Sequence, residues 1–193
     1  MRLAIFGGTF DPIHRAHLAI AREAAEQCRL DRVLLVPAAN PPHKSGVTHA
    51  PYEHRVRMAE IACHGLAHLE VSRLEEGTER SYSIDTIEKV RARMAPGDDL
   101  FFVIGADAFA EIRTWKRWPD VVRAVEFVVV SRPGVSFQAP SGARLERLDR
   151  LELAVSSSEI RRELAAGRRP AAVPEAVLDY IREHRLYGSG QLP

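Results

Sequence analysis

The sequence predicts an α/β fold, a doubly wound parallel sheet with helices packed on both faces. Apolar runs alternate with helical patterns along the chain, and alternation of this kind gives a parallel sheet. Two of the runs, Leu100–Ile104 and Phe127–Val130, are continuously apolar, as in strands that are covered on both faces. A chain of 193 residues with 46% hydrophobic content can bury a core of its own. We therefore expect a single domain over residues 1–193.

Apolar runs and helical periodicity predict the elements in order. We expect strands at Leu3–Phe6, Arg32–Pro37, Leu69–Ser72, Leu100–Ile104, Phe127–Val130 and Leu151–Val155. We expect helices at Ala16–Cys28, Tyr52–His64, Ile84–Met94, Ser157–Ala166 and Pro174–His184. The first helix places Leu18, Ala21, Ala25 and Cys28 on one face, and Pro96-Gly97 ends the third. The helical C-terminal part, about 157–187, is expected to pack on the sheet.

Composition narrows the classes of partner. The 27 basic and 26 acidic residues nearly cancel, so nothing demands a polyanion or an acidic membrane surface. Aromatic residues make up only 7%, which argues against a base-stacking surface for nucleic acid. Two cysteines make no disulfide framework, and Cys63, His64 and His68 match no zinc spacing. With no signal-peptide or membrane-spanning pattern, we expect a cytoplasmic protein without a resident metal.

The stretch Gly7–His17, GGTFDPIHRAH, is the most informative part of the chain. A strand runs into two glycines, which let the backbone approach a ligand closely, and then into a helix start with free N–H groups. His14 and His17 are spaced to share one face of that helix. Together these features predict a phosphate site with two imidazoles. The alternative is a plain strand–helix turn with a solvated or capping histidine.

The segment Val155–Arg161, VSSSEIR, carries a second phosphate signal. Ser156 with Glu159 fits a capping box that would merely start a helix. Three serines at a helix start also suit phosphate oxygens, and Arg161 is close enough to reach the same anion. Capping and binding are compatible, because different serines can do each.

Four shorter motifs follow strands or precede helices. Gly105 and Asp107 lie at the end of a buried strand, where a carboxylate can accept from ribose hydroxyls or cap a helix. Lys44, in NPPHK, could bring a positive charge to a phosphate, or could simply be solvated. Ser83, in SYSIDTI, could be an N-cap. Trp115, in TWKRW, is by default part of a core-facing helix stripe but could stack on a ring.

These motifs resemble a known family. GGTFDPIHRAH and VSSSEIR resemble the two signatures of the H-x-G-H nucleotidyltransferase superfamily, and NPPHK, SYSIDTI, IGAD and TWKRW look like those of bacterial nicotinate-nucleotide adenylyltransferases. The ending PEAVLDYIREHRLY resembles the C-terminal helix of that family. Ala16 stands where the family has glycine, and its methyl group could crowd a nucleotide on the turn. Ser83 stands where threonine is usual and keeps the hydroxyl.

The resemblance implies a Rossmann-like nucleotidyltransferase fold and transfer of AMP from ATP to nicotinate mononucleotide, with Mg²⁺ accompanying the ATP. It implies that His14, His17 and Arg161 are catalytic. It implies an ATP site made by Gly8, Thr9, Phe10, His14, His17, Gly105, Asp107, Ser157, Ser158 and Arg161. Lys44, Ser83 and Trp115 would bind the acceptor. The expected partners are these small molecules, neither nucleic acid nor membrane, and a homo-oligomer stays possible.

Other classes of function make different demands on the sequence. A related adenylyltransferase for phosphopantetheine or nicotinamide mononucleotide would keep the GGTFDPIHRAH and VSSSEIR motifs but not NPPHK, SYSIDTI and TWKRW together. A dinucleotide-dependent oxidoreductase predicts G-x-G-x-x-G after the first strand, which GGTFDP does not supply. A nucleotide sensor would bind without turnover. The sequence leaves the discrimination between acid and amide acceptors open.

Overall fold

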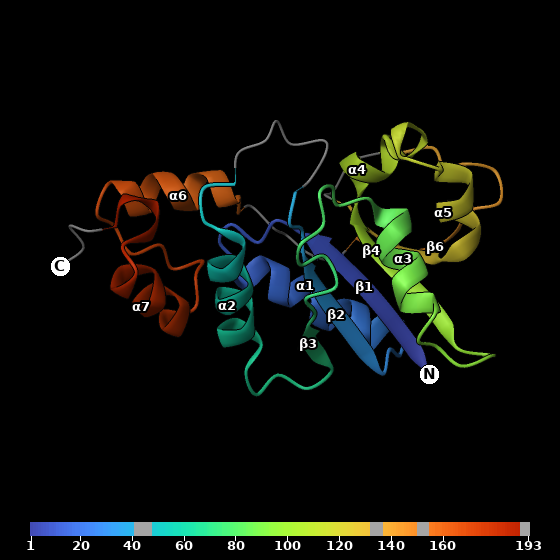
Figure 1. The fold of residues 1–193 in the computed structure, drawn as a ribbon, viewed down its shortest axis with the longest axis horizontal. Coiled ribbons are helices and arrows are strands. Elements are labelled where there is room, and N and C mark those ends of the chain that lie inside the picture. Colours follow the sequence, from blue (N-terminus) through green and yellow to red (C-terminus); the bar gives the residue numbers. More distant parts are fainter. Residues whose placement is uncertain (41–47, 132–136, 150–154, 190–193) are drawn as a thin grey trace.

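The six strands form one parallel sheet, in the order β3-β2-β1-β4-β5-β6 (Figure 1). The computed structural model describes residues 1–40, 48–131, 137–149 and 155–189. The strands are β1 (Arg2–Gly8), β2 (Arg32–Pro37), β3 (Leu69–Val71), β4 (Asp99–Gly105), β5 (Glu126–Val130) and β6 (Arg144–Leu148). All five pairings are parallel, which confirms the predicted doubly wound sheet.

Helices cover both faces of the sheet. They are α1 (Arg15–Gln27), α2 (Tyr52–Cys63), α3 (Ser83–Arg91), α4 (Ala106–Ala110), α5 (Trp118–Ala124), α6 (Ser157–Ala165) and α7 (Glu175–Glu183), with 3₁₀ turns η1 (Ile112–Thr114) and η2 (Leu186–Gly188). Successive strand residues point to opposite faces, so Ala4 and Phe6 join one buried cluster while Leu3 and Ile5 join the other. Within the described ranges, no helix is both long and apolar enough to cross a membrane.

The sixth strand corrects the prediction from sequence. It is formed by Arg144–Leu148, a segment for which no element was predicted. Its charged residues are typical of an edge strand, because charges at an edge oppose pairing with another chain, and they hid the strand from a hydrophobicity pattern. The predicted strand Leu151–Val155 lies outside the described residues except for Val155, which is in no strand.

The C-terminal helices extend the core on one face. Figure 1 shows α6 and α7 beyond α2, at the end of the molecule away from α5. Ile160, Leu164 and Ile181 belong to the same buried cluster as Phe6 of β1. His54 of α2 and Tyr180 of α7 are hydrogen-bonded, with 2.9 Å between Nδ1 and the hydroxyl oxygen. The end of the chain is thereby brought back to the first half of the sheet.

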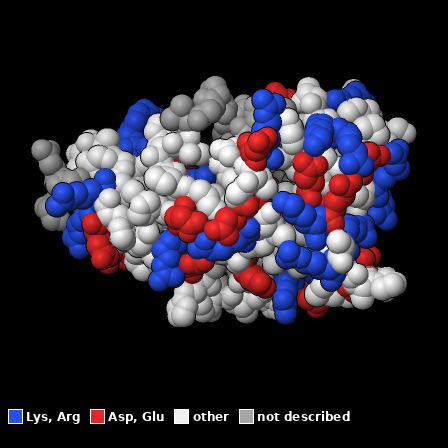
Figure 2. Space-filling view, viewed as in Figure 1, with Lys and Arg blue, Asp and Glu red and all other residues white. Residues whose placement is uncertain are grey.

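Charged side chains of both signs are interspersed over the face viewed in Figure 2, as the near-zero net charge predicts. Many of them pair on the surface. Arg73, for example, lies 2.8 Å from Glu53, 3.6 Å from Glu60 and 3.5 Å from Glu76. Exposed pairs of this kind contribute little to stability, so the fold is held by its buried clusters.

One buried cation fastens the carboxyl ends of the first two strands. Arg55 of α2 is fully buried, and its guanidinium donates to four main-chain carbonyls. The acceptors are Thr9 at 2.8 Å, Ala38 at 2.7 Å, Ala50 at 3.1 Å and Ala39 at 3.5 Å. Thr9 follows β1 and Ala38 follows β2, so one side chain fixes both loops. The planar fork of arginine suits this task, since its donors point in fixed directions.

A second buried charge, that of Asp11, attracts this cation through space. Its carboxylate accepts hydrogen bonds from the N–H groups of His49, at 2.7 Å, and Ala50, at 3.1 Å. The hydroxyl of Tyr187, in η2, donates to the same carboxylate at 2.6 Å. Burial and the Asp11 charge raise the pKa of Tyr187, so this hydroxyl keeps its proton. Three segments far apart in sequence therefore meet at the loop after β1.

Removing the Arg55 guanidinium should destabilise the fold strongly. Arg55→Met would leave carbonyls unpaired and the Asp11 charge without its counter-charge, which costs roughly 3 kcal/mol in the free energy of unfolding. Urea unfolding measures the loss. The matched control is Arg57→Met on the same helix, where the guanidinium only pairs with Glu60 on the surface and the change should stay within about 0.5 kcal/mol. Equal losses in the two variants would contradict this account.

Candidate active site

Two cavities adjoin at the carboxyl edge of the sheet, where the strand order reverses between β1 and β4. This is the place at which open parallel sheets bind ligands. The volumes are about 290 and 300 Å³. Phe6 and Gly105 line both, so the cavities meet at the ends of the two central strands. After the groups that line them, we name the cavity of about 300 Å³ the polar cavity and the cavity of about 290 Å³ the apolar cavity.

The polar cavity is built by the starts of α1, α4 and α6. Its polar groups come from His14, His17, Asp107, Ser131, Ser156 and Ser157. The first turn of α1 contains no acidic residue, so no side-chain charge there neutralises the positive end of the helix dipole. The structure thus brings the two predicted histidines and two of the three predicted serines around one space. Ala16, the departure from the family motif, also lies in the wall.

His17 is held in one orientation by the helix start itself. The N–H of His14, the N-cap residue, donates to His17 Nδ1 at 3.3 Å. This is the geometry of a capping box, with histidine in place of the usual glutamate or glutamine. Because Nδ1 accepts this bond, the ring proton of the neutral imidazole sits on Nε2. His17 therefore presents an N–H donor at its outer nitrogen.

Aromatic packing supports the two imidazoles. The rings of His14 and His17 stack with centroids 3.7 Å apart, and Phe10 meets His17 edge-on at 5.0 Å. Phe10 is buried and has a left-handed backbone, with φ of 47°. A Cβ on Gly8 would lie 3.0 Å from the Phe10 ring, so the close approach requires glycine there. The predicted ATP contact of Phe10 stays a prediction, since its ring faces the core.

His14 is kept neutral by its surroundings. It is 4% exposed, and burial lowers its pKa from 6.5 to about 4. Its Nδ1 has no hydrogen-bond partner among the described residues. A buried polar atom without a partner destabilises the free protein, and a ligand group that bonds to this imidazole would remove that penalty.

The start of α6 docks against the loop after β1. Ser156 is the N-cap of α6 and accepts from the Glu159 N–H at 3.2 Å, which is one half of the predicted capping box; the Glu159 carboxylate accepts from the Ser156 hydroxyl at 3.0 Å and not from the Ser156 N–H. The Ser157 hydroxyl lies 3.4 Å from the Pro12 carbonyl. Arg161 donates to the Asp11 carbonyl at 2.7 Å and to the Ser158 hydroxyl at 3.2 Å. Arg161 thus contacts the loop after β1 and Ser158 contacts Arg161, and both residues line neither cavity.

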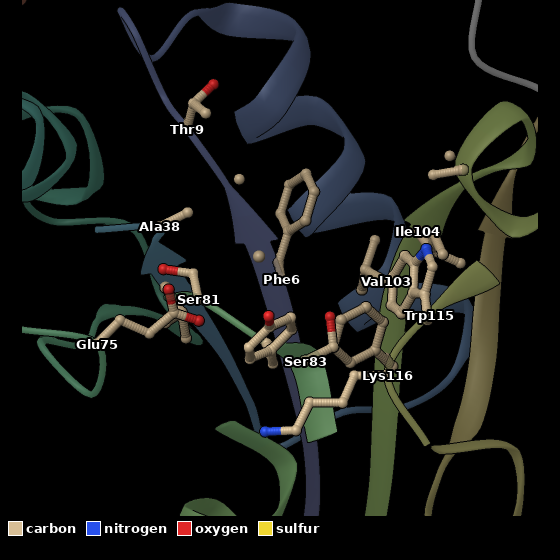
Figure 3. A pocket seen from close by; sticks show the side chains of 17 residues that line it. Phe6, Thr9, Ala38, Glu75, Ser81, Ser83, Val103, Ile104, Trp115 and Lys116 are labelled. Atoms are coloured by element: carbon tan, nitrogen blue, oxygen red, sulfur yellow. The ribbon is translucent and has the colours of Figure 1, made fainter. Parts of the chain in front are cut away.

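The apolar cavity lies on the other side of Phe6 (Figure 3). Val103, Ile104 and Trp115 form one side of it, with Glu75 and Ser81 across from them. Trp115 is half-buried and packs edge-on against Phe102, with centroids 6.0 Å apart. Its size and its aromatic wall suit a flat ring with a polar substituent.

Several predicted site residues take positions that the sequence did not define. The N-cap of α3 is Tyr82, so the prediction of Ser83 as a cap is wrong, and its hydroxyl lines the apolar cavity instead. Trp115 is the C-cap that follows η1 and Trp118 is the first residue of α5, so the two do not form one helix stripe. Gly8 and Thr9 line the apolar cavity and Asp107 the polar one. Lys44 lies outside the described residues.

Other residues near the site were missed by sequence reasoning. Arg55 was detectable, because it occupies the same helical face as Ala59 and Ala62, where an apolar residue is expected. Asp11 was visible only as part of the first motif. Glu75 and Lys116, the charged residues that line the apolar cavity within the described segments, carry no local pattern that marks them.

Comparison with known proteins defines the family to which the chain belongs. The sequence model of the cytidylyltransferase-like family matches residues 5–163, and the chain belongs to this family of nucleotidyltransferases. A relative from Solibacter usitatus is 68% identical, over 97% of this chain and 100% of its own length. One from Thermus thermophilus is 45% identical with the same coverage. Both are described as probable nicotinate-nucleotide adenylyltransferases, and the chain belongs to that branch of the family.

A solved structure supports the fold independently. Nicotinic acid mononucleotide adenylyltransferase of Plasmodium falciparum, complexed with NaAD, aligns with a TM-score of 0.78 over 96% of this chain and 97% of its own. At 21% sequence identity, this likeness shows that the arrangement of strands and helices is shared.

The buried His14 should make stability depend on pH. Between pH 6.5 and about 4 the unfolded chain binds a proton that the folded protein excludes, so the free energy of unfolding falls as the pH is lowered through this window. His14→Gln should reduce that loss by at most about 3 kcal/mol. Urea unfolding at several pH values measures it. An NMR titration midpoint of His14 near 6.5 would contradict the effect of burial.

Proposed function

We propose that this protein transfers AMP from ATP to nicotinate mononucleotide, giving deamido-NAD and pyrophosphate. The observation that carries the proposal is the pair of cavities that meet at Phe6 and Gly105. One offers hydrogen-bond donors and a helix start for a triphosphate, and the other offers an apolar slot with an aromatic face for the acceptor. The names of the curated relatives supply the identity of the acceptor.

The reaction needs little from the protein beyond placement. An oxygen of the acceptor's phosphate attacks the α-phosphorus of ATP, the bond to the β-phosphate oxygen breaks, and pyrophosphate leaves with that electron pair. The acceptor's phosphate, with a second pKa of about 6, is already anionic and needs no general base. Catalysis then rests on positioning the two nucleotides and stabilising the charge that develops on the leaving group.

We assign that stabilisation to the polar cavity. The fixed Nε2–H of His17, the imidazole of His14 and the N–H groups at the start of α1 would donate to the phosphates of ATP. Ser157 would bind the same chain of phosphates. Arg161 would reach the β- and γ-phosphates by exchanging its bonds to Ser158 and Asp11 for bonds to phosphate oxygens.

The wall residues fit a magnesium ion that arrives with ATP. The described residues contain no group of three or more acidic, histidine or cysteine side chains that could hold a metal. Magnesium keeps several waters and binds largely through substrate phosphates, so it needs few protein ligands. The Ser157 hydroxyl would hold it here, while Asp107 and Gly105 meet the ribose. When bound, the ion would neutralise charge on the departing pyrophosphate.

The acceptor would occupy the apolar cavity. Trp115 would lie against the pyridine ring, with Ser83 and its neighbouring main chain near the carboxylate. We propose that Lys44 meets a phosphate of either nucleotide.

The described cysteines, Cys28 and Cys63, are free and buried, and burial raises the pKa of each thiol to about 11. They are unreactive as nucleophiles and suit a reducing compartment, in support of the proposed cytoplasmic location.

A coupled assay of pyrophosphate release tests the function directly. The purified protein is supplied with ATP and one acceptor at a time: nicotinate mononucleotide, nicotinamide mononucleotide or phosphopantetheine. We expect the highest kcat/KM with a pyridine mononucleotide. Release that is absent with both pyridine nucleotides, or faster with phosphopantetheine, would overturn the proposal.

Loss of the His17 imidazole should slow turnover. His17→Ala removes a fixed donor to the phosphates, and kcat should fall by roughly a hundredfold or more, since the donor acts as charge develops. The same pyrophosphate assay measures it, with circular dichroism to verify folding. His64→Ala, at an exposed histidine that ends α2, is the control and should keep full turnover. Near-normal kcat in His17→Ala would remove the assigned role.

A side chain introduced at the junction of the two cavities should weaken the binding of both substrates. Gly105 has φ of −71° and ψ of 147°, which any residue adopts, and a Cβ there would meet no atom within 4 Å. Gly105→Val should fold normally, yet raise the KM for ATP and for the acceptor by roughly tenfold each, because its methyl groups would fill the shared space. Thermal unfolding checks stability. An effect on one substrate alone would argue against a shared junction.

A further inference from the structure

We propose that Lys116 determines the preference for an acid over an amide acceptor, by moving its ammonium from Asp85 to the carboxylate of the bound ring. The inference rests on the proposed function, in which the apolar cavity takes a pyridine mononucleotide. Nicotinate and nicotinamide mononucleotides have nearly the same shape, and they differ by one negative charge and by the N–H donors of the amide. Main-chain donors respond to the second difference, and a cation beside the ring substituent responds to the first.

The apolar cavity already contains a fixed negative charge that disfavours an acid. Glu75 lines it and is 7% exposed. Its carboxylate is held by the Thr86 hydroxyl at 2.7 Å and by the Ala39 N–H at 3.4 Å, so it cannot turn away. A second carboxylate in the same low-dielectric space would be repelled. A positive charge within reach of this cavity would offset that repulsion and favour the acid.

Lys116 is the cation that lines this cavity among the described residues. It follows Trp115, the proposed stacking residue, directly in the sequence. In the free protein its Nζ lies 3.1 Å from an Asp85 carboxylate oxygen and 4.4 Å from the centre of the Tyr82 ring. Figure 3 shows its ammonium directed away from Trp115 in that view. In the free protein the Lys116 ammonium therefore lies at the edge of the cavity, paired with Asp85.

Releasing this ammonium costs little. The Lys116 and Asp85 side chains are 43% and 41% exposed, and ion pairs at such positions contribute little to stability. The four-carbon stem of lysine is flexible, and its three N–H donors need no fixed direction. A carboxylate on a ring in the apolar cavity is less hydrated than Asp85. A hydrogen bond between two charged groups gains strength in that setting, whereas an amide offers only a neutral acceptor.

Asp85 acts against the acid in this arrangement, because it competes for the same ammonium. It lies in the first turn of α3, two residues after Ser83. Removing its charge should therefore favour nicotinate binding, while removing the charge of Lys116 should disfavour it. Two variants of one ion pair are expected to change selectivity in opposite directions. If the ion pair had only a structural role, the two variants would change the selectivity in the same direction.

The experiment measures the ratio of affinities for nicotinate and nicotinamide mononucleotides by titration calorimetry, and the ratio of kcat/KM values in the pyrophosphate assay. Lys116→Met should lower both ratios by about tenfold, which corresponds to a charged hydrogen bond at a partly exposed site. Asp85→Asn should raise them by about twofold to threefold. The control is Lys89→Met on α3, whose Nζ donates to the Leu74 carbonyl and which does not line this cavity. Its ratios should stay within about twofold of the parent protein.

Each result decides between the proposals. Equal ratios in Lys116→Met and Lys89→Met, or shifts of the same sign in Lys116→Met and Asp85→Asn, would overturn the role of Lys116. Calorimetric ratios that shift as expected, in a protein that releases no pyrophosphate, would uphold that role and overturn the proposed function. A parent protein that binds neither mononucleotide would overturn both.

Discussion

The hydrogen bonds of two buried charges, Arg55 and Asp11, are the constraint on which the site depends. Their hydrogen bonds hold the carbonyls of Thr9 and Ala38 and the N–H groups of His49 and Ala50 in one place. Thr9 and Ala38 line the apolar cavity, and the loop after Thr9 leads into the histidines of the polar one. A charge buried in this way is stable only while its partners stay in position, so the network also resists movement of the loops. The geometry for two substrates is therefore set before either binds.

The two histidines are likewise held in place before a ligand binds. The N–H of His14, the N-cap of α1, donates to His17 Nδ1, which fixes the ring proton of His17 on the outer nitrogen, and burial keeps His14 uncharged. Neutral donors at a helix start can stabilise charge as it develops on the leaving pyrophosphate, and they need no reorganisation to do so. Phe10 and Gly8 contribute by packing, because the ring of Phe10 supports His17 and leaves room only for glycine at position 8.

Much of the fold followed from the sequence because a parallel sheet buried on both faces leaves continuous apolar runs. The failures have physical causes. Arg144–Leu148 is an edge strand whose charges conceal it, and Arg55 resembles any helical arginine until the carbonyls that it binds are known. The motifs placed His14, His17 and Ser157 correctly around one cavity, since each follows a strand or starts a helix. Spacing could not show that Phe10 turns inward, that Ser83 is no cap, or that Lys116 stands beside the apolar cavity, because these depend on loops packed by distant residues.

A crystal structure of the protein with deamido-NAD would test the central claim most directly, since this molecule joins both halves of the proposed site. The account predicts its adenylyl phosphate beside His14 and His17, its pyridine ring against Trp115, and its linkage passing over Gly105. Density for both nucleotide halves within a single cavity, or for the pyridine ring among the histidines and serines, would contradict the account.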